Sequence, residues 1–244
     1  MKKSKKKKPN KFFNIFNPKY LFMDFVRTTG WLSMQVTARP KYHYYGNAPK
    51  TRKIKGRALL ACNHTDWIDP ALISVAYIRR RVFVVTAKEG MSKGISQLFF
   101  RGIHCIPIDR TANDFTAFNK TVDLLKNDKT VLIFPEGRLS DPQSADTMPF
   151  KSGMTLMALR ANAPIIPVYS PGGHKAFKRA HLVIGEPINL REHFDGQLHM
   201  QNIEMLTLVV QERMRELKDE WERISAEETA RTENKKKKRT ENDD

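Results

Sequence analysis

The hydrophobic positions after Pro40 alternate between short continuous apolar runs and longer segments with helical spacing. Continuous apolar runs of this length are typical of strands covered on both faces. We therefore predict strands at 57–62, 82–87, 105–109, 131–134, 165–169 and 181–185. Helical spacing, with Pro70 at a first-turn position and Pro164 after a last turn, predicts helices at 70–79, 92–100, 112–127, 151–162 and 199–226.

This strand–helix alternation predicts an α/β fold, with a mainly parallel central sheet flanked by helices. Residues 41–56 are expected to add an antiparallel hairpin at one edge of the sheet. The sequence contains no internal repeat and no sign of a second folded unit. We therefore expect one α/β domain over residues 41–228.

The segment before this domain has aromatic and aliphatic residues at helical spacing, in the pairs Phe12/Phe16, Leu21/Phe25 and Phe22/Val26. Its longest apolar runs fall far short of the ~20 residues that a membrane-spanning helix needs. It also lacks the small-residue cleavage site of a signal peptide. We predict an N-terminal amphipathic helical, membrane-facing segment at 12–40. The alternative is a helix that packs on the core of the domain, and one helix can serve both purposes.

Charge is concentrated at the two ends of the chain. The formal net charge is +17, residues 1–11 hold seven lysines and no acid, and residues 235–239 hold five further cations. We predict a basic disordered tail at 1–11 and a charged disordered tail at 229–244. Lysines beside an amphipathic segment favour anionic membrane lipids as a partner. Nucleic acid is not expected, because no aromatic residues interleave with the lysines.

The two cysteines, Cys62 and Cys105, each lie within a predicted strand, and their number and spacing match neither a disulfide framework nor a zinc site. A reducing compartment is the simplest inference. Combined with the basic tail and the amphipathic segment, this predicts a peripheral protein on the cytoplasmic face of the cell membrane.

A histidine follows the first predicted strand of the domain and has a carboxylate five residues later. His64 is expected at the carboxyl end of a strand, where ligand sites in open α/β sheets gather. Neutral imidazole can accept a proton from an alcohol if a partner stabilises the imidazolium that forms. Asp69 can do this if the chain turns before the helix, and Asp66 is a competing partner.

Two further strand ends carry cations. Phe134-Pro135-Glu136-Gly137-Arg138 follows the predicted strand 131–134, and Arg110 follows the predicted strand 105–109. Proline and glycine around Glu136 indicate a tight turn, and an arginine fork suits phosphate. Glu136 is expected to orient an arginine or to accept from a substrate hydroxyl. Together with His64, these residues predict a base and an anion site on one rim of the sheet.

These residues resemble, in order, the four motif blocks of the glycerolipid acyltransferase family: Asn63-His64 with Asp69, Gly102 with Ile108-Asp109-Arg110, Phe134-Pro135-Glu136-Gly137, and Ile165-Ile166-Pro167-Val168. The best-known bacterial members of that family are 1-acylglycerol-3-phosphate acyltransferases. The resemblance covers roughly residues 55–190. It implies transfer of an acyl group from acyl-CoA or acyl carrier protein to the glycerol hydroxyl of a lysophospholipid, without a metal or other cofactor.

The resemblance also implies roles for single residues. His64 would be the general base and Asp69 its orienting partner. Arg110, Glu136, Gly137 and Arg138 would bind the phosphate of the acceptor, and Ile166, Pro167 and Val168 would line the acyl side. Family members that use 1-acyl-sn-glycerol-3-phosphate and form phosphatidic acid commonly have Pro-Glu-Gly-Thr-Arg-Ser. Here Arg138 follows Gly137 directly, which is similar to members that use larger headgroups, such as lysophosphatidylethanolamine.

Two other functions remain as alternatives. A hydrolase would need a serine nucleophile, and the sequence has no Gly-x-Ser-x-Gly elbow. A non-catalytic module tethered by its tails would not require the His64–Asp69 pair. Of the remaining histidines, His104 and His181 are expected to be structural. His174, after Pro171-Gly172-Gly173, is expected on a loop surface, with a position lining a pocket as the alternative.

Overall fold

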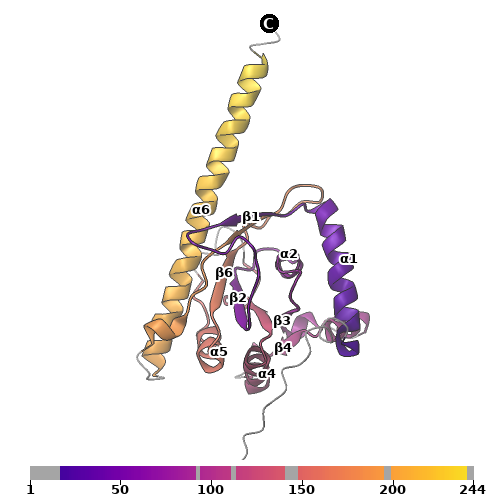
Figure 1. The fold of residues 1–244 in the computed structure, drawn as a ribbon, viewed down its shortest axis with the longest axis vertical. Coiled ribbons are helices and arrows are strands. Elements are labelled where there is room, and N and C mark those ends of the chain that lie inside the picture. Colours follow the sequence, from indigo (N-terminus) through magenta and orange to yellow (C-terminus); the bar gives the residue numbers. More distant parts are fainter. Residues whose placement is uncertain (1–16, 92–93, 111–113, 141–147, 195–198, 241–244) are drawn as a thin grey trace, which may run out of the picture.

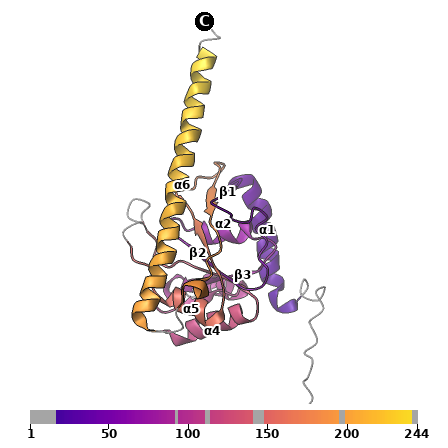
Figure 2. The same cartoon turned by 60° about the vertical axis from the view of Figure 1, so that its left-hand side comes forward.

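The computed structural model describes residues 17–91, 94–110, 114–140, 148–194 and 199–240. The predicted tail at 1–11 and the aromatic residues of 12–16 lie outside the described residues, as do residues 241–244. Within the described part, the α/β architecture predicted from the sequence is confirmed. A central sheet is flanked by helices, with α1 and α6 at opposite sides of the molecule (Figure 1; Figure 2).

The sheet has seven strands in the order β1-β7-β6-β2-β5-β3-β4. Every neighbouring pair is parallel except β6 and β7. β2, in the middle, is fully buried, as its continuous apolar run predicts. The bounds are β1 Lys41–Tyr44, β2 Ala58–Cys62, β3 Val82–Ala87, β4 Ile106–Ile108, β5 Thr130–Ile133, β6 Ile165–Tyr169 and β7 His181–Ile184.

The prediction of an antiparallel edge hairpin at 41–56 is wrong. β1 is the edge strand, but it pairs in parallel with β7, Lys41 opposite His181 and Tyr44 opposite Ile184. The antiparallel partner of β7 is β6. A pairing between strands so far apart in sequence leaves no local signal, whereas a hairpin is suggested by nearby turn residues, and that local signal was misleading here.

Helices cover both faces of the sheet. One core lies between the sheet and α4 (Phe115–Lys126), α5 (Gly153–Ala161) and the first turns of α6 (Met200–Thr240). A second core lies on the other face, under α2 (Asp69–Ala76) and the end of α1 (Leu21–Thr37), beside α3 (Ile95–Gly102). The central strands are thus buried on both faces, and the candidate site residues lie in the loops at the strand ends.

The last helix is longer than predicted. We expected it to end near 226 and a disordered tail to begin at 229, but α6 continues to Thr240 and projects from the domain (Figure 1). Its packed apolar residues include Trp221, and arginines and glutamates pair along the helix, including Arg223 with Glu220 and Glu227. Such residues have high helix propensity, and ion pairs three or four residues apart support the helix further. A charged composition is therefore compatible with a helix in this segment.

The N-terminal helix α1 is amphipathic and is attached to the domain along one side. Met23 is buried, and Asp24 forms a two-point ion pair with Arg81. The opposite side is open, with Phe25 and Leu32 more than 60% exposed. In the part of the chain that the structure describes, no helix combines the length and apolar character needed to cross a bilayer. The helix therefore packs on the core and still presents an apolar surface.

Candidate active site

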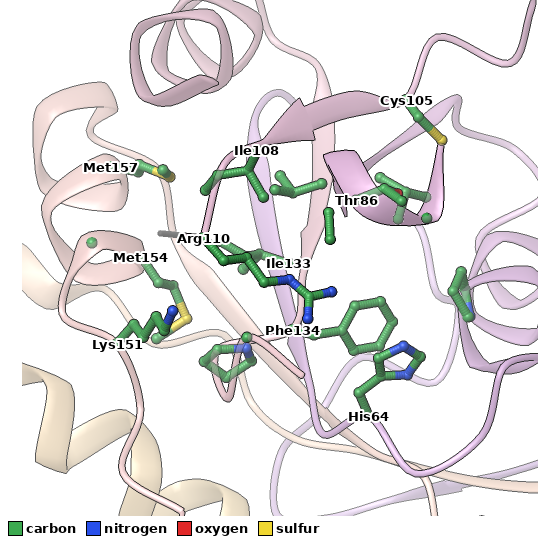
Figure 3. Close-up of a pocket in the computed structure, with 18 of the residues that line it drawn as sticks. His64, Thr86, Cys105, Ile108, Arg110, Ile133, Phe134, Lys151, Met154 and Met157 are labelled. Carbon is green, nitrogen blue, oxygen red and sulfur yellow. The ribbon is translucent and has the colours of Figure 1, made fainter. Parts of the chain in front are cut away.

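Four loops at the carboxyl ends of parallel strands meet at one rim of the sheet. His64 follows β2, Arg110 follows β4, the Phe134–Arg138 turn follows β5, and Ser170 follows β6. His64, Arg110 and Arg138 line one cavity of about 1700 Å³, whose other walls are mainly apolar residues from α1, α3, α4 and α5. Figure 3 shows the guanidinium of Arg110 pointing toward the rings of His64 and Phe134. The rim combines a base, cations and an apolar space.

The structure brings His64 and Asp69 together. Nδ1 of His64 lies 3.4 Å from Oδ2 of Asp69, across the turn that enters α2. The imidazole ring stacks on Phe134, with 4.1 Å between ring centroids, which leaves the side chain about one-fifth exposed toward the cavity. The competing carboxylate of Asp66 instead accepts from the backbone N–H groups of Ile68 and His174. Asp69 is thus the carboxylate in contact with the histidine.

Asp69 is fully buried and is surrounded by donors. Oδ2 also accepts from the backbone N–H groups of Thr65 at 3.0 Å and Asp66 at 2.7 Å. Oδ1 accepts from the Ser170 hydroxyl at 2.7 Å. Burial opposes ionisation of Asp69, but hydrogen bonds from His174, His64, Ser170 and the backbone outweigh it and lower the pKa to about 2. The partner of His64 is therefore a carboxylate ion at neutral pH.

Glu136 lies differently from our expectation. Its carboxylate is buried and accepts from the hydroxyl of Ser140 and from the backbone N–H of His64, rather than orienting an arginine. Ser140 in turn donates its backbone N–H to the carbonyl of His64 at 2.7 Å. Burial raises the pKa of Glu136, while the hydrogen bonds from Ser140 and His64 oppose that rise. Glu136 thus fixes the backbone of the histidine.

The rest of the turn, together with nearby Lys151, places basic side chains at the cavity. Gly137 donates its N–H to the carbonyl of Phe134 and has a φ of +72°, a conformation that favours glycine. Arg138 is exposed, and its Nε lies 3.0 Å from the sulfur of Met148. Lys151 lines the same cavity, and its ammonium lies beside Gly137. Three basic side chains, those of Arg110, Arg138 and Lys151, are therefore available to an anionic group there.

Sequence reasoning assigned no role at this site to three residues that the structure places there. Asn63 and Ser170 exchange two hydrogen bonds of 2.7 Å that join the ends of β2 and β6. His174, expected on a loop surface, has a side chain that is only 7% exposed and lies 3.4 Å from Asp69. The position of Ser170 directly after a predicted strand was a usable signal. For His174 the sequence allowed a place in a pocket after Pro171-Gly172-Gly173, but its contact with Asp69 depends on the path of the loop after β6.

The two histidines expected to be structural, His181 and His104, lie outside this site. His181 in β7 stacks on His43 and contacts Trp221 of α6, as a structural residue would. His104 lies before β4 rather than in it, with Nε2 2.8 Å from the carbonyl of Lys19. At the site itself, two histidines and an aspartate meet, yet in the described ranges no group of three ligating side chains is arranged to hold a metal ion.

Comparison with known proteins identifies the family. A family model described as Acyltransferase matches residues 39–170, more than half of the chain. The chain belongs to the acyltransferase family. This acyltransferase is 25% identical over 171 residues to the 1-acyl-sn-glycerol-3-phosphate acyltransferase of Bacillus subtilis (strain 168), a match that covers 68% of this chain and 83% of that protein. The resemblance stated from the motif blocks is thus confirmed.

A second relative and a solved structure are also similar. A 1-acyl-sn-glycerol-3-phosphate acyltransferase of Cocos nucifera is 28% identical over 130 residues, covering 52% of this acyltransferase and 41% of that protein. The crystal structure of the 1-acyl-sn-glycerophosphate acyltransferase PlsC from Thermotoga maritima matches with a TM-score of 0.55 at 17% identity, over 81% of this chain and 77% of that one. At this identity the structural likeness supports the fold alone.

Proposed function

We propose that this acyltransferase moves a fatty acyl group from acyl-CoA or acyl carrier protein to the free glycerol hydroxyl of 1-acyl-sn-glycerol-3-phosphate, giving phosphatidic acid. The observation that carries the proposal is the contact between His64 and the ionised Asp69, at the mouth of a large apolar cavity that also receives Arg110 and Arg138. The names of the relatives from Bacillus subtilis and Cocos nucifera agree with this acceptor.

In the proposed reaction His64 is the general base. Its Nδ1 faces Asp69, so Nε2 is the nitrogen available to the substrate. Nε2 takes the proton of the glycerol hydroxyl as the oxygen attacks the thioester carbonyl carbon. Asp69 stabilises the imidazolium that forms. The carbon–sulfur bond then breaks, the acyl group stays on the glycerol oxygen, and the proton on His64 is available to the leaving thiolate. The reaction needs neither a metal nor another cofactor.

The acceptor phosphate is assigned to Arg110 and Arg138, with Gly137 providing the turn and Glu136 acting through the backbone of His64. The apolar walls of the cavity suit the acyl chains. The alternative acceptor, a lysophospholipid with a larger headgroup such as lysophosphatidylethanolamine, follows from the position of Arg138 directly after Gly137. A terminal phosphate carries more charge than a phosphodiester, so the two acceptors should respond differently to loss of an arginine.

Replacing Arg110 with alanine tests this assignment. A charge-assisted hydrogen bond contributes about 1.5–3 kcal/mol, so the KM for 1-acyl-sn-glycerol-3-phosphate should rise about 10- to 100-fold. The KM for the acyl donor should change less than about twofold, because Arg110 is assigned to the acceptor. Initial rates measured with both acceptors, and with CoA and carrier-protein thioesters, give these constants.

The matched control for this test is Arg215→Ala, because Arg215 is an exposed arginine on α6 paired with Glu212. It should leave both KM values unchanged. A raised donor KM with an unchanged acceptor KM in Arg110→Ala would place the arginine at the donor instead. A wild-type preference for lysophosphatidylethanolamine would favour the alternative acceptor.

We also propose that the protein binds the cytoplasmic face of the membrane peripherally, through α1 and α3. The open side of α1 is continuous with α3, because Phe22 contacts Phe99 and packs against Gly102. α3 has no buried residue, and its Ile95 and Leu98 are 88% and 73% exposed. The same helices wall the cavity, so a lipid acceptor could enter from the bilayer. Anionic lipids suit the lysines of residues 1–11.

Introducing two glutamates into this surface should weaken binding of the protein to vesicles. The double substitution Phe25→Glu and Leu98→Glu changes exposed side chains and so spares the core. Each of the two substitutions removes an apolar side chain whose full burial contributes about 1.5–3 kcal/mol. The partition coefficient of the protein between vesicles and water should therefore fall at least about tenfold. Co-sedimentation with anionic vesicles measures it. Met205→Glu, at an equally exposed apolar position on α6, is the control and should bind normally; equal loss in both proteins would reject this surface.

A further inference from the structure

A second histidine contacts the carboxylate that orients His64. His174 lies in the loop after β6, and its Nε2 is 3.4 Å from Oδ1 of Asp69 and 3.1 Å from the hydroxyl oxygen of Ser170. Its backbone N–H is held by the carboxylate of Asp66, 3.2 Å away. Asp69 thus bridges two imidazoles, with His64 on Oδ2 and His174 on Oδ1.

The hydrogen-bond pattern shows which ring nitrogen of His174 carries a hydrogen. Asp69 is ionised and can only accept, so the Ser170 hydroxyl must donate its single proton to Oδ1 at 2.7 Å. The oxygen of Ser170 is then an acceptor toward Nε2 of His174. Nε2 must therefore carry a hydrogen, which it shares between Ser170 and Asp69. His174 is a donor to the carboxylate in either of its protonation states.

His64 competes for Asp69 with four other donors. Two backbone N–H groups share Oδ2 with it, and Ser170 and His174 occupy Oδ1. A carboxylate offers about four lone-pair sites, and five donors are present here. The contact of His64, at 3.4 Å, is longer than those of Ser170 and both N–H groups. Each donor on Oδ1 therefore withdraws charge that would otherwise stabilise the imidazolium of His64.

We propose that His174, together with Ser170, is a positioning residue that holds Asp69 in place and limits the basicity it confers on His64. The inference rests on the proposed role of His64 as the base. The expected consequence has a definite sign. Without the donor on Oδ1, Asp69 interacts more strongly with protonated His64, so His64 holds its proton to higher pH. The carboxylate also becomes free to rotate.

Other charged groups near the two histidines stay unchanged in this comparison. Glu136 holds the backbone N–H of His64, and Arg110 points toward its ring from the cavity. Asp66 holds the backbone of His174, a contact that survives any change of its side chain. A difference between variants at position 174 therefore reports on Asp69 rather than on these neighbours.

The test compares His174→Phe, which keeps a planar ring but has no donor, with His174→Gln, whose amide can still donate. Ser170→Ala removes the other donor on Oδ1 and serves as a second probe if the phenylalanine variant does not fold. Two quantities are measured: the NMR titration midpoint of the His64 ring, which needs no substrate, and kcat as a function of pH in acyl transfer. The NMR midpoint separates failure of this inference from failure of the proposed acceptor.

For His174→Phe we expect the His64 midpoint, and the acid limb of kcat, to move up by about one pH unit. We also expect kcat to fall on the order of tenfold at its optimum, with both KM values within about twofold of wild type. Ser170→Ala should shift the His64 midpoint in the same direction. His174→Gln should keep both the His64 midpoint and kcat close to their wild-type values. Unchanged His64 midpoints in both His174→Phe and Ser170→Ala would overturn the proposal, as would wild-type kcat in His174→Phe.

Discussion

Replacement of His64 by alanine is expected to lower acyl transfer by on the order of 10³-fold, within the contribution of a positioned general base. His64 is the histidine at the cavity mouth with an ionised carboxylate behind it and a free ring nitrogen in front. Without it, the glycerol hydroxyl must attack while still protonated. The loss should appear in kcat, because substrate binding is assigned to the arginines and to the apolar walls.

The fold should survive this substitution. The backbone of His64 is held by Ser140 and Glu136, and neither contact involves the imidazole. The thermal unfolding midpoint, followed by circular dichroism, checks this directly. His199→Ala, at an exposed histidine before α6, is the matched control and should remain fully active. Transfer by a folded His64→Ala protein at a rate close to wild type would rule out histidine catalysis.

Asp69→Asn is expected to cost about 10²- to 10⁴-fold in kcat, because an amide neither stabilises the imidazolium nor holds the ring in the right tautomer. Asp69 acts through His64, so the two losses should not add. The double variant His64→Ala/Asp69→Asn should have the same residual rate as His64→Ala alone. A further drop of tenfold or more in the double variant would mean that Asp69 contributes to the reaction independently.

The same substitution should change how stability depends on pH. The folded-state pKa of Asp69, about 2, lies below the ordinary value of about 3.9, so its ionisation stabilises the fold above about pH 4. That contribution, about 3 kcal/mol, is lost as the pH falls from about 4 to about 2. Asparagine does not titrate, so urea unfolding of wild type and Asp69→Asn should converge across this window.

The fold and the rim of the site were predictable because both depend on local patterns. Six of the seven strands were continuous apolar runs, and His64, Arg110 and Glu136 each followed one of them. Parallel strands bring their carboxyl ends to one edge, so the convergence of these loops needed no tertiary information. The contact of Asp69 rather than Asp66 with His64 required the turn geometry, which spacing alone leaves open.

The features that the sequence did not reveal depend on pairs far apart in the chain. β1 pairs with β7 across about 140 residues, and His174 reaches Asp69 across more than 100. Glu136 was expected to serve a substrate or an arginine, yet its partners are a serine four residues later and the backbone of another loop. In each case the hydrogen-bond partner of a polar side chain or an edge strand is one that the local sequence pattern does not identify.

The most direct test of the central claim is to measure both products of one reaction. Purified protein is given an acyl thioester and 1-acyl-sn-glycerol-3-phosphate, and free thiol and phosphatidic acid are quantified together. The proposed function predicts one phosphatidic acid for each thiol released, with neither product formed above background by His64→Ala. Thiol release matched by free fatty acid, with no acylated product from any lysophospholipid, would contradict acyl transfer and indicate a hydrolase.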